Sequence, residues 1–241
     1  MGLCSGDTEA LMGLLETDAL PGRRFYATTL DAGGTLRWYP VIADMAQSAD
    51  LAFTSGPFVH SGDDGAKIHG DFLSLWKRDS DCRWQIEFEG SISHAAPTQT
   101  EPGLKSDQAH YTRRDGPPAA LVTADAVSQS MSDFKDTLKE DGFAAGLRTY
   151  GRTLDFYFLI DGEAPMGMAA ANRYLTAHMM AGEWRERARG LSADSTFAYS
   201  VGEIHGAHQR SSHICVQIWQ YDPRVVNWGL RLLFISPSMS K

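Results

Sequence analysis

An internal repeat is the feature of this sequence that most restricts its fold. Residues 52–58 read AFTSGPF, and residues 198–204 read AYSVGEI. Each segment follows a Ser-Ala-Asp triplet and precedes a hairpin whose second arm alternates in polarity and ends in a tryptophan, Trp76 or Trp219. A polar turn, a second tryptophan and a last apolar strand follow in both copies, at an offset that stays between 143 and 146 residues. Because order and spacing are kept together, the pattern indicates a duplication.

The second copy carries upstream elements that the first copy lacks. Four apolar residues follow Asp125, the predicted helix cap, at helical spacing: Val127, Met131, Phe134 and Leu138. A strand is predicted over 154–160, before an Asp-Gly turn, and an Ala- and Met-rich helix over 166–180. The first copy begins with a similar helix over 7–15 but is about 27 residues shorter before its shared strands. Helices followed by a strongly curved antiparallel sheet are an α+β arrangement.

Several segments resemble a known family. The segments 36–44 (LRWYPVIAD) and 70–78 (GDFLSLWKR) and the strand 84–94 are similar to the SnoaL-like or domain-of-unknown-function branch of the nuclear transport factor 2-like superfamily. The resemblance covers residues 7–97 and 120–237. It implies a cone, in which a curved sheet wraps a helix layer and leaves a pocket at the open end. Because the superfamily includes ketosteroid isomerases, polyketide cyclases, dehydratases and non-catalytic association domains, it implies the fold and leaves the reaction open.

The resemblance and the shorter first copy together predict two cone-shaped units, each a curved antiparallel sheet packed on helices, the first with a truncated helical part. The units span 1–97 and 119–241, and the Pro-, Gly- and Thr-rich segment 98–118 is the predicted linker. A truncated first unit would expose an apolar concave face. We therefore expect either intra-chain repeat pairing, which makes a pseudo-dimer, or a homodimer. The tether favours intra-chain pairing, because it holds the units at millimolar effective concentration.

Composition and charge exclude several classes of protein. The formal net charge of −8 disfavours nucleic-acid binding, which needs a basic surface. No apolar run is long enough to cross a bilayer, so no membrane partner is predicted. The first residues lack the regions of a signal peptide, so we expect a cytoplasmic protein, or a periplasmic or secreted one if a signal peptide was removed. The three cysteines (Cys4, Cys82 and Cys215) make no disulfide framework and leave at least one thiol free unless chains pair.

Three residues of the first copy are candidates for acid–base catalysis. Relatives in the family often carry an aspartate at the position of Glu89, where a carboxylate could act as a base if its pKa were raised. His69 and Asp71 share strand parity, and an Asp–His pair could orient the imidazole for proton transfer. The alternatives are that Glu87 and Glu89 face solvent on the outer side of the sheet and that 69–71 is a polar hairpin arm. His94 is predicted to cap or pack the end of its strand.

The second copy differs at the matching positions. Leu233 stands where the first copy has Glu89, and Arg231 stands within an apolar run where the first copy has Glu87. A buried guanidinium needs an anion, so Arg231 predicts an internal partner, with Glu203 as the nearest choice, or a bound carboxylate. The alternative is a packed stem whose head reaches water. With Arg231, four residues are candidates to line a ligand pocket, the alternative being satisfied core residues: Tyr157, Tyr199, His213 and Gln217.

No metal or cofactor is predicted. His205, His208 and His213 are close in sequence but straddle a predicted hairpin turn and lack a cysteine pair or a well-placed carboxylate. No GxSxG, P-loop, GxGxxG or HExxH motif occurs. The segment 183–189 (EWRERAR) is predicted as a solvated charged segment.

Two function classes remain. The acids are not kept in both copies, and the first copy lacks the elements that would exclude water from a site. The sequence therefore favours a small-molecule-binding or scaffold protein with a cone-shaped pocket, a small hydrophobic ligand and little or no catalysis. The alternative is an isomerase, dehydratase or polyketide-cyclase-like enzyme that acts on a hydrophobic carbonyl compound by acid/base proton transfer.

Overall fold

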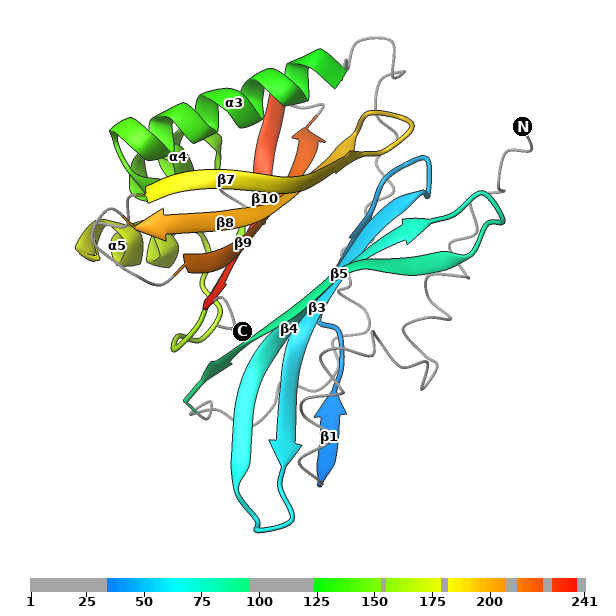
Figure 1. Ribbon diagram of the computed structural model, residues 1–241, viewed down its shortest axis with the longest axis vertical. Coiled ribbons are helices and arrows are strands. Elements are labelled where there is room, and N and C mark those ends of the chain that lie inside the picture. Colours follow the sequence, from blue (N-terminus) through cyan, green and yellow to red (C-terminus); the bar gives the residue numbers. More distant parts are fainter. Residues whose placement is uncertain are drawn as a thin grey trace. The chain divides into compact units, whose positions relative to one another are not determined.

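The computed structural model describes residues 34–95, 124–152, 155–178, 182–206, 212–222 and 227–237. These residues belong to two compact units, one with strands β1 to β5 and one with elements α3 to β10, and the turn Gly162–Ala164 groups with the first (Figure 1). Each unit holds a five-stranded sheet, so the predicted α+β class is confirmed. The helix predicted over 7–15 and the linker predicted over 98–118 lie outside the described residues.

The first unit is an antiparallel meander with a broken edge. Its strands are β1 (Thr35–Trp38), β2 (Ile42–Met45), β3 (Leu51–Ser61), β4 (Lys67–Arg78) and β5 (Trp84–His94). Strands β3, β4 and β5 pair in sequence order, and both β1 and β2 pair with the other side of β3. Pro40 lies between β1 and β2 and has no N–H to donate, which explains why the edge is divided into two short strands.

The second unit places three helices on one face of its sheet. The helices are α3 (Ala124–Glu140), α4 (Phe143–Tyr150) and α5 (Met168–Ala177), and the strands are β6 (Tyr157–Ile160), β7 (Gly182–Leu191), β8 (Phe197–Gly206), β9 (Ser212–Asp222) and β10 (Asn227–Pro237). The strand order is β6-β10-β9-β8-β7, with β6 parallel to β10 and the other pairs antiparallel. We call the side of the sheet that carries the helices the helix face and the other side the outer face (Figure 1).

The structure confirms most of the predicted elements of the second unit and corrects two points. Helices α3 and α5 and strand β6 lie where the spacing predicts them. Helix α4 is not predicted. The segment 183–189 is part of strand β7, and its arginines are exposed, as predicted for a solvated charged segment. Asp125 lies in the first turn of α3, one residue inside the helix, so it is not the cap.

Aromatic rings fill the space between the helices and the sheet of the second unit. Phe134 of α3 is fully buried and meets the rings of Phe143, Tyr150 and Trp219 edge to face, at centroid distances of 6.4, 5.8 and 5.4 Å. The four residues predicted to form one face of α3 are all buried: Val127, Met131, Phe134 and Leu138. Helix α3 is therefore held to the sheet by its apolar face.

A β-bulge occurs at the matching place in each meander. The register of β4 on β5 shifts next to Trp76, and Glu87 is the extra residue. The register of β9 on β10 shifts next to Trp219, and Arg231 is the extra residue. Because a bulge interrupts the alternation of side chains, both charged residues leave the strict inside–outside pattern of their strands.

The turns that precede β3 and β8 have the same hydrogen bonds. The N–H groups of Ala46 and Ser192 each donate to the carbonyl of the first residue of the following strand, at 2.8 and 2.9 Å. The residue three positions later, Ala49 or Ser195, has a φ of 54° and donates back at 2.9 Å. Aligning the two turns pairs Ala46 with Ser192. In that alignment the two Ser-Ala-Asp triplets do not coincide, because they are shifted by two residues relative to each other.

Removing the ring of Phe134 tests this packing. We expect Phe134→Ala to lower the free energy of unfolding by about 3–5 kcal/mol, because it leaves a cavity among three other rings. Lys135→Ala, on the exposed side of the same helix, should change it by less than about 0.5 kcal/mol. Urea unfolding followed by tryptophan fluorescence measures both, and equal effects would contradict the packing of α3 on the sheet.

Candidate functional site

The candidate acids of the first unit lie on opposite faces of its sheet. Thr54, Ser74 and Glu89 oppose one another across three strands, on the face that also carries Trp76. We call it the tryptophan face. Asp71 is an odd number of residues away from Ser74 on β4, so its side chain lies on the other face. One site therefore cannot contain both Glu89 and Asp71.

Asp71 pairs with His94, whereas the sequence predicts a pair with His69. Oδ2 of Asp71 lies 2.8 Å from Nε2 of His94, and the side chains of Asp71 and His94 are 4% and 7% exposed. His69 is half-buried and opposes His94 across the β4–β5 ladder. The shared parity of His69 and Asp71 is correct, but the antiparallel neighbour brings its own histidine closer to the carboxylate.

Asp71 and His94 share one proton across the contact between the carboxyl group and the imidazole ring. Nδ1 of His94 lies 2.7 Å from the carbonyl oxygen of Ala95, which can only accept, so Nδ1 carries a hydrogen. The short contact between Nε2 and the carboxyl then contains one further proton, on the ring or on the acid. The pair is neutral overall in both cases. Burial raises the pKa of Asp71, and the hydrogen bond and charge of His94 oppose that rise.

Glu89 points toward the tryptophan face rather than toward solvent. Its side chain is half-buried, its Oε2 atom is buried, and its Oε1 atom lies 3.5 Å from the hydroxyl of the fully buried Ser74. On the same face, the indole N–H of Trp76 donates to Thr54 at 3.1 Å. Glu87, the extra residue of the bulge, is exposed. The two glutamates thus differ in environment, although the sequence treats them alike.

The two tyrosines predicted to line a pocket lie on the outer face of the second sheet. Tyr157 opposes Leu232, Leu232 opposes Ile218, and Ile218 opposes Tyr199, so the four side chains form one row. Tyr199 is 1% exposed and its ring lies against Gly190, where a Cβ would come within 2.2 Å of it.

The other two predicted pocket residues do not join this row. Gln217 opposes Ser200 on the helix face, is 2% exposed, and accepts a hydrogen bond of 3.1 Å from the indole N–H of Trp219. His213 is half-buried near the start of β9, opposite Ile204. The structure therefore places the two tyrosines in one row, separated by Leu232 and Ile218, and places Gln217 on the other face of the sheet.

Arg231 has an internal anionic partner, but it is not Glu203. Its Nε lies 3.9 Å from the carboxylate of Asp155, which Arg152 binds with two hydrogen bonds of 2.7 and 2.8 Å. Arg152 also lies 3.6 Å from Asp222. Glu203 instead pairs at the surface with an arginine of β7 at 3.2 Å. Two arginines and two aspartates balance in charge, so this cluster needs no bound carboxylate.

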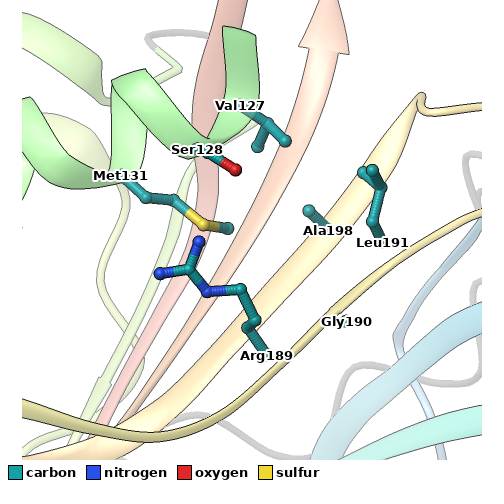
Figure 2. Close-up of a pocket in the computed structure, with 7 residues that line it drawn as sticks. All are labelled: Val127, Ser128, Met131, Arg189, Gly190, Leu191 and Ala198. Carbon is teal, nitrogen blue, oxygen red and sulfur yellow. The ribbon is translucent and has the colours of Figure 1, made fainter. Parts of the chain in front are cut away.

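A pocket of about 230 Å³ lies between α3 and the strands β7 and β8 (Figure 2). It is lined by Val127, Ser128, Met131, Arg189, Gly190, Leu191 and Ala198. None of the residues predicted as site residues lines it. The sequence feature that could have indicated this pocket is Arg189, the last charged residue of β7.

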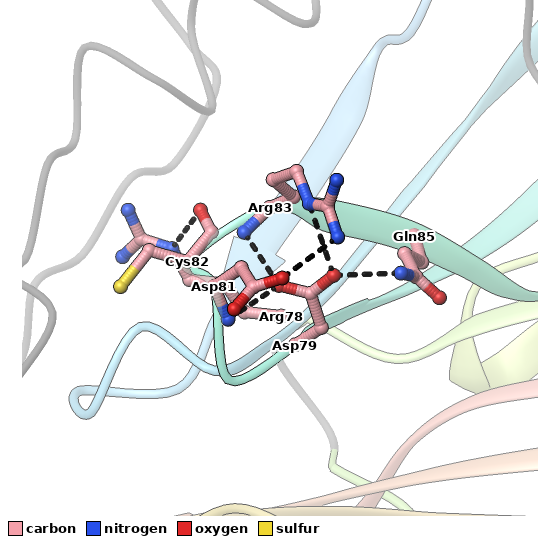
Figure 3. Close-up of polar contacts among 6 residues, drawn as sticks. All are labelled: Arg78, Asp79, Asp81, Cys82, Arg83 and Gln85. Carbon is pink, nitrogen blue, oxygen red and sulfur yellow. Dashed lines mark hydrogen bonds and ion pairs between the residues drawn. The ribbon is translucent and has the colours of Figure 1, made fainter. Parts of the chain in front are cut away.

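A polar network closes the β4–β5 hairpin of the first unit (Figure 3). The carboxylate of Asp79 accepts backbone N–H bonds of 2.9 Å from Asp81 and Arg83 and a bond of 2.7 Å from the amide of Gln85. The bond from the backbone N–H of Arg83 is the main reason that the pKa of Asp79 is lowered. This network orders a turn and presents no unused group to a ligand.

The part of the chain that the structure describes contains no cluster of three His, Cys, Asp or Glu side chains that could hold a metal ion. His205 lies 3.3 Å from Glu203, and His208 is outside the described residues. Cys82 is disulfide-bonded, which the sequence does not predict, whereas Cys215 is free and buried, and burial raises the pKa of its thiol well above the ordinary value. None of the described helices is long and apolar enough to cross a membrane.

Solved structures similar to this chain match about half of it. No family model and no curated protein matches the sequence. A nuclear transport factor 2-like protein of unknown function from Shewanella oneidensis MR-1 is 12% identical, over 46% of this chain and 97% of that chain, with a TM-score of 0.38. A nuclear transport factor 2-like protein from Cytophaga hutchinsonii is 8% identical, over 47% and 97%, with a TM-score of 0.38. A proposed ketosteroid isomerase from Parabacteroides distasonis is 9% identical, over 45% and 86%, with a TM-score of 0.38. The superfamily that the sequence resembles is therefore among these structures.

The raised pKa of Asp71 predicts the sign of a pH effect. A raised pKa means that the folded state favours the protonated acid, so the stability that Asp71 contributes is present below its ordinary pKa of 3.8 and is lost as the pH rises through the raised value. We therefore expect Asp71→Asn to gain stability relative to the unmodified protein between about pH 3 and pH 7. Urea unfolding at several pH values measures this difference.

Asp79→Asn is the matched control, because the pKa of Asp79 is lowered. Its carboxylate contributes stability above the ordinary pKa and loses it as the pH falls through the lowered value. The Asp79→Asn variant should therefore lose stability relative to the unmodified protein over the same rise in pH. Parallel curves for the two variants would contradict the assignment of Asp71.

Proposed function

We propose that this chain is a scaffold or binding protein with little or no catalysis, built from two diverged copies of one unit. The observation that carries this proposal is the filled helix face of the second sheet. The rings of Phe134, Tyr150 and Trp219 meet there at 5.4 to 5.8 Å, in the space that a cone-shaped pocket would occupy. Leu233, at the position of the candidate acid, is fully buried. An enzyme site would need a cavity with an ionisable group in it.

The bulges and turns support descent from one duplicated unit. Bulges arise at defined places and are kept within families, because they set the bend and twist of a sheet. Here both meanders have a bulge beside the first tryptophan of the repeat, Trp76 or Trp219. Both also begin with a turn whose fourth residue, Ala49 or Ser195, has the same positive φ of 54°. Two unrelated sheets have no physical reason to share both features at matching positions.

The tether between the two units favours intra-chain pairing over a homodimer, because it holds them at millimolar effective concentration. Tyr199, Ile218 and Leu232 of the outer face are at most 1% exposed in a single chain. On the face of the first sheet opposite to the tryptophan face, Phe53 and Leu73 are fully buried. An apolar face of this kind needs cover from water. We propose that the two units supply it for each other, as a pseudo-dimer.

A second candidate function rests on Glu89. Its half-buried carboxylate lies beside a buried hydroxyl on the tryptophan face, which is an environment where a general base works. This placement favours the acid/base alternative, in which the first unit moves a proton on a hydrophobic carbonyl compound. The second unit has no counterpart, since Leu233 occupies the matching position.

Native mass spectrometry of the purified chain tests the scaffold proposal. We expect the mass of one chain without a co-purifying apolar molecule, because aromatic rings fill the centre of the helix face of the second unit and, in the proposed pseudo-dimer, the two units cover each other. A stoichiometric apolar ligand would contradict the filled cone. A dimer that persists at nanomolar concentration would contradict intra-chain pairing.

Deuterium exchange next to the carbonyl of a hydrophobic ketone tests the alternative. If the chain is a scaffold, neither the unmodified protein nor Glu89→Gln speeds exchange above the rate in buffer, as followed by proton NMR. Glu87→Gln, at the exposed bulge, is the matched control. Exchange that the protein accelerates and that Glu89→Gln alone abolishes would replace the scaffold proposal with the enzyme.

A further inference from the structure

The pocket between α3 and β7 lies at the rim of the helix face, and none of the aromatic rings that fill the centre of that face lines it. It lies wholly within the second unit and is open to solvent beside Arg189, whose side chain is 51% exposed. We propose that this pocket binds a small carboxylate with an apolar body. The proposal is independent of the pairing of the units and of the chemistry of Glu89.

A β-bulge positions the cation of this pocket. Glu186 and Arg189 are three residues apart on β7, so strict alternation would place them on opposite faces. The register between β7 and β8 shifts after Glu186, and as a result Glu186 opposes Gly202 while Arg189 opposes Ser200. Both side chains therefore lie on the helix face, which is where the pocket opens.

Two residues, Glu186 and Ser200, fix the orientation of the guanidinium. The hydroxyl of Ser200 donates to Oε2 of Glu186 at 2.9 Å, and Nε of Arg189 donates to Oε1 of the same carboxylate at 2.7 Å. Glu186 thus holds Arg189 through Nε, and the terminal nitrogens remain available. Figure 2 shows the end of the guanidinium directed toward Met131 of α3, at the pocket.

The terminal nitrogens of Arg189 offer a fork that suits a carboxylate. Within the described residues, Glu186 is the one side chain that bonds Arg189. Two parallel N–H donors on a planar guanidinium match the two oxygens of a carboxylate, and such charge-assisted bonds are about twice as strong as neutral ones. The hydroxyl of Ser128 lines the same pocket from α3 and adds a further donor (Figure 2).

The rest of the pocket is apolar and small. Val127 and Ala198 are 3% and 1% exposed, and Met131 and Leu191 complete the apolar wall. On the outer side of β7, the ring of Tyr199 packs against Gly190 and supports this wall from behind. A volume of about 230 Å³ is below that of sites for drug-sized molecules, which are roughly 300–1,000 Å³. The fitting ligand is therefore a carboxylate with a short chain or a single ring.

Titration of the full chain with benzoate tests the proposal. We expect saturable shifts in the ¹H–¹⁵N spectrum at the amides of Ser128, Gly190 and Leu191. Benzamide has the same shape without the charge and should bind at least about tenfold more weakly, because it cannot accept charge-assisted bonds from the guanidinium. Arg189→Gln should weaken benzoate binding by a similar factor and leave the rest of the spectrum unchanged, since the side chain is half exposed.

Arg185→Gln is the matched control. Arg185 is on the same strand, is 57% exposed and is ion-paired like Arg189, but it opposes Glu203 on the outer face. Its substitution should leave benzoate binding unchanged. Equal binding of benzamide and benzoate, equal losses in the two arginine variants, or shifts that map away from the pocket would each overturn the proposal. A ligand that binds weakly and reversibly in this pocket is lost during purification. A failed benzoate titration is therefore distinguishable from the outcome of native mass spectrometry.

Discussion

The edge-to-face contact between Phe134 and Trp219 is the interaction on which the second unit depends. It joins the middle of α3 to the central strand β9, and both rings are fully buried. Because the rings occupy the space over the centre of the sheet, α4 packs beside them with its own aromatic residues, Phe143 and Tyr150, and with Gly146, where a Cβ would lie 2.7 Å from the ring of Phe134. The same filling moves any open space to the rim, where α3 approaches the edge strand β7. The location of the pocket is thus a consequence of the core.

Charged residues at bulges are the second constraint shared by the two sheets. The extra residue is Glu87 in β5, Arg187 in β7 and Arg231 in β10. Glu87 and Arg187 reach solvent, so their charges need no compensation. Arg231 is 6% exposed, and its burial requires Asp155 nearby together with the second ion pair of Arg152. A bulge at a sheet edge therefore displays a charge, whereas a bulge in a central strand demands a buried network.

Alternation of apolar residues and helical spacing made most of the helices and strands predictable from the sequence. The side-chain partners across strands were not predictable, because they depend on how neighbouring strands align. Helix α3 and strand β5 show clear periodicity, because their apolar residues recur on one face. Strand β7 does not, since it is an edge strand whose alternation is broken at Arg187. The partner of Asp71 is His94 because of how β5 aligns on β4, and parity within one strand cannot reveal that alignment. The partner of Arg231 likewise comes from a connecting segment, at Asp155.

The two units share one arrangement of antiparallel strands but place their ionisable groups differently, so the chemistry open to each unit differs. In the second unit, buried charges are held in balanced ion pairs, and Leu233 and the rings leave no acid in the core. In the first unit, the buried acid Asp71 shares a proton with His94 and remains neutral as a pair, so it can be buried at low cost in free energy. Such a pair uses its hydrogen-bonding capacity internally and has little left for a substrate. Glu89 lies on the opposite face of the same sheet, half-buried and 3.5 Å from the hydroxyl of Ser74, so the acid/base chemistry proposed for the first unit rests on Glu89 rather than on Asp71.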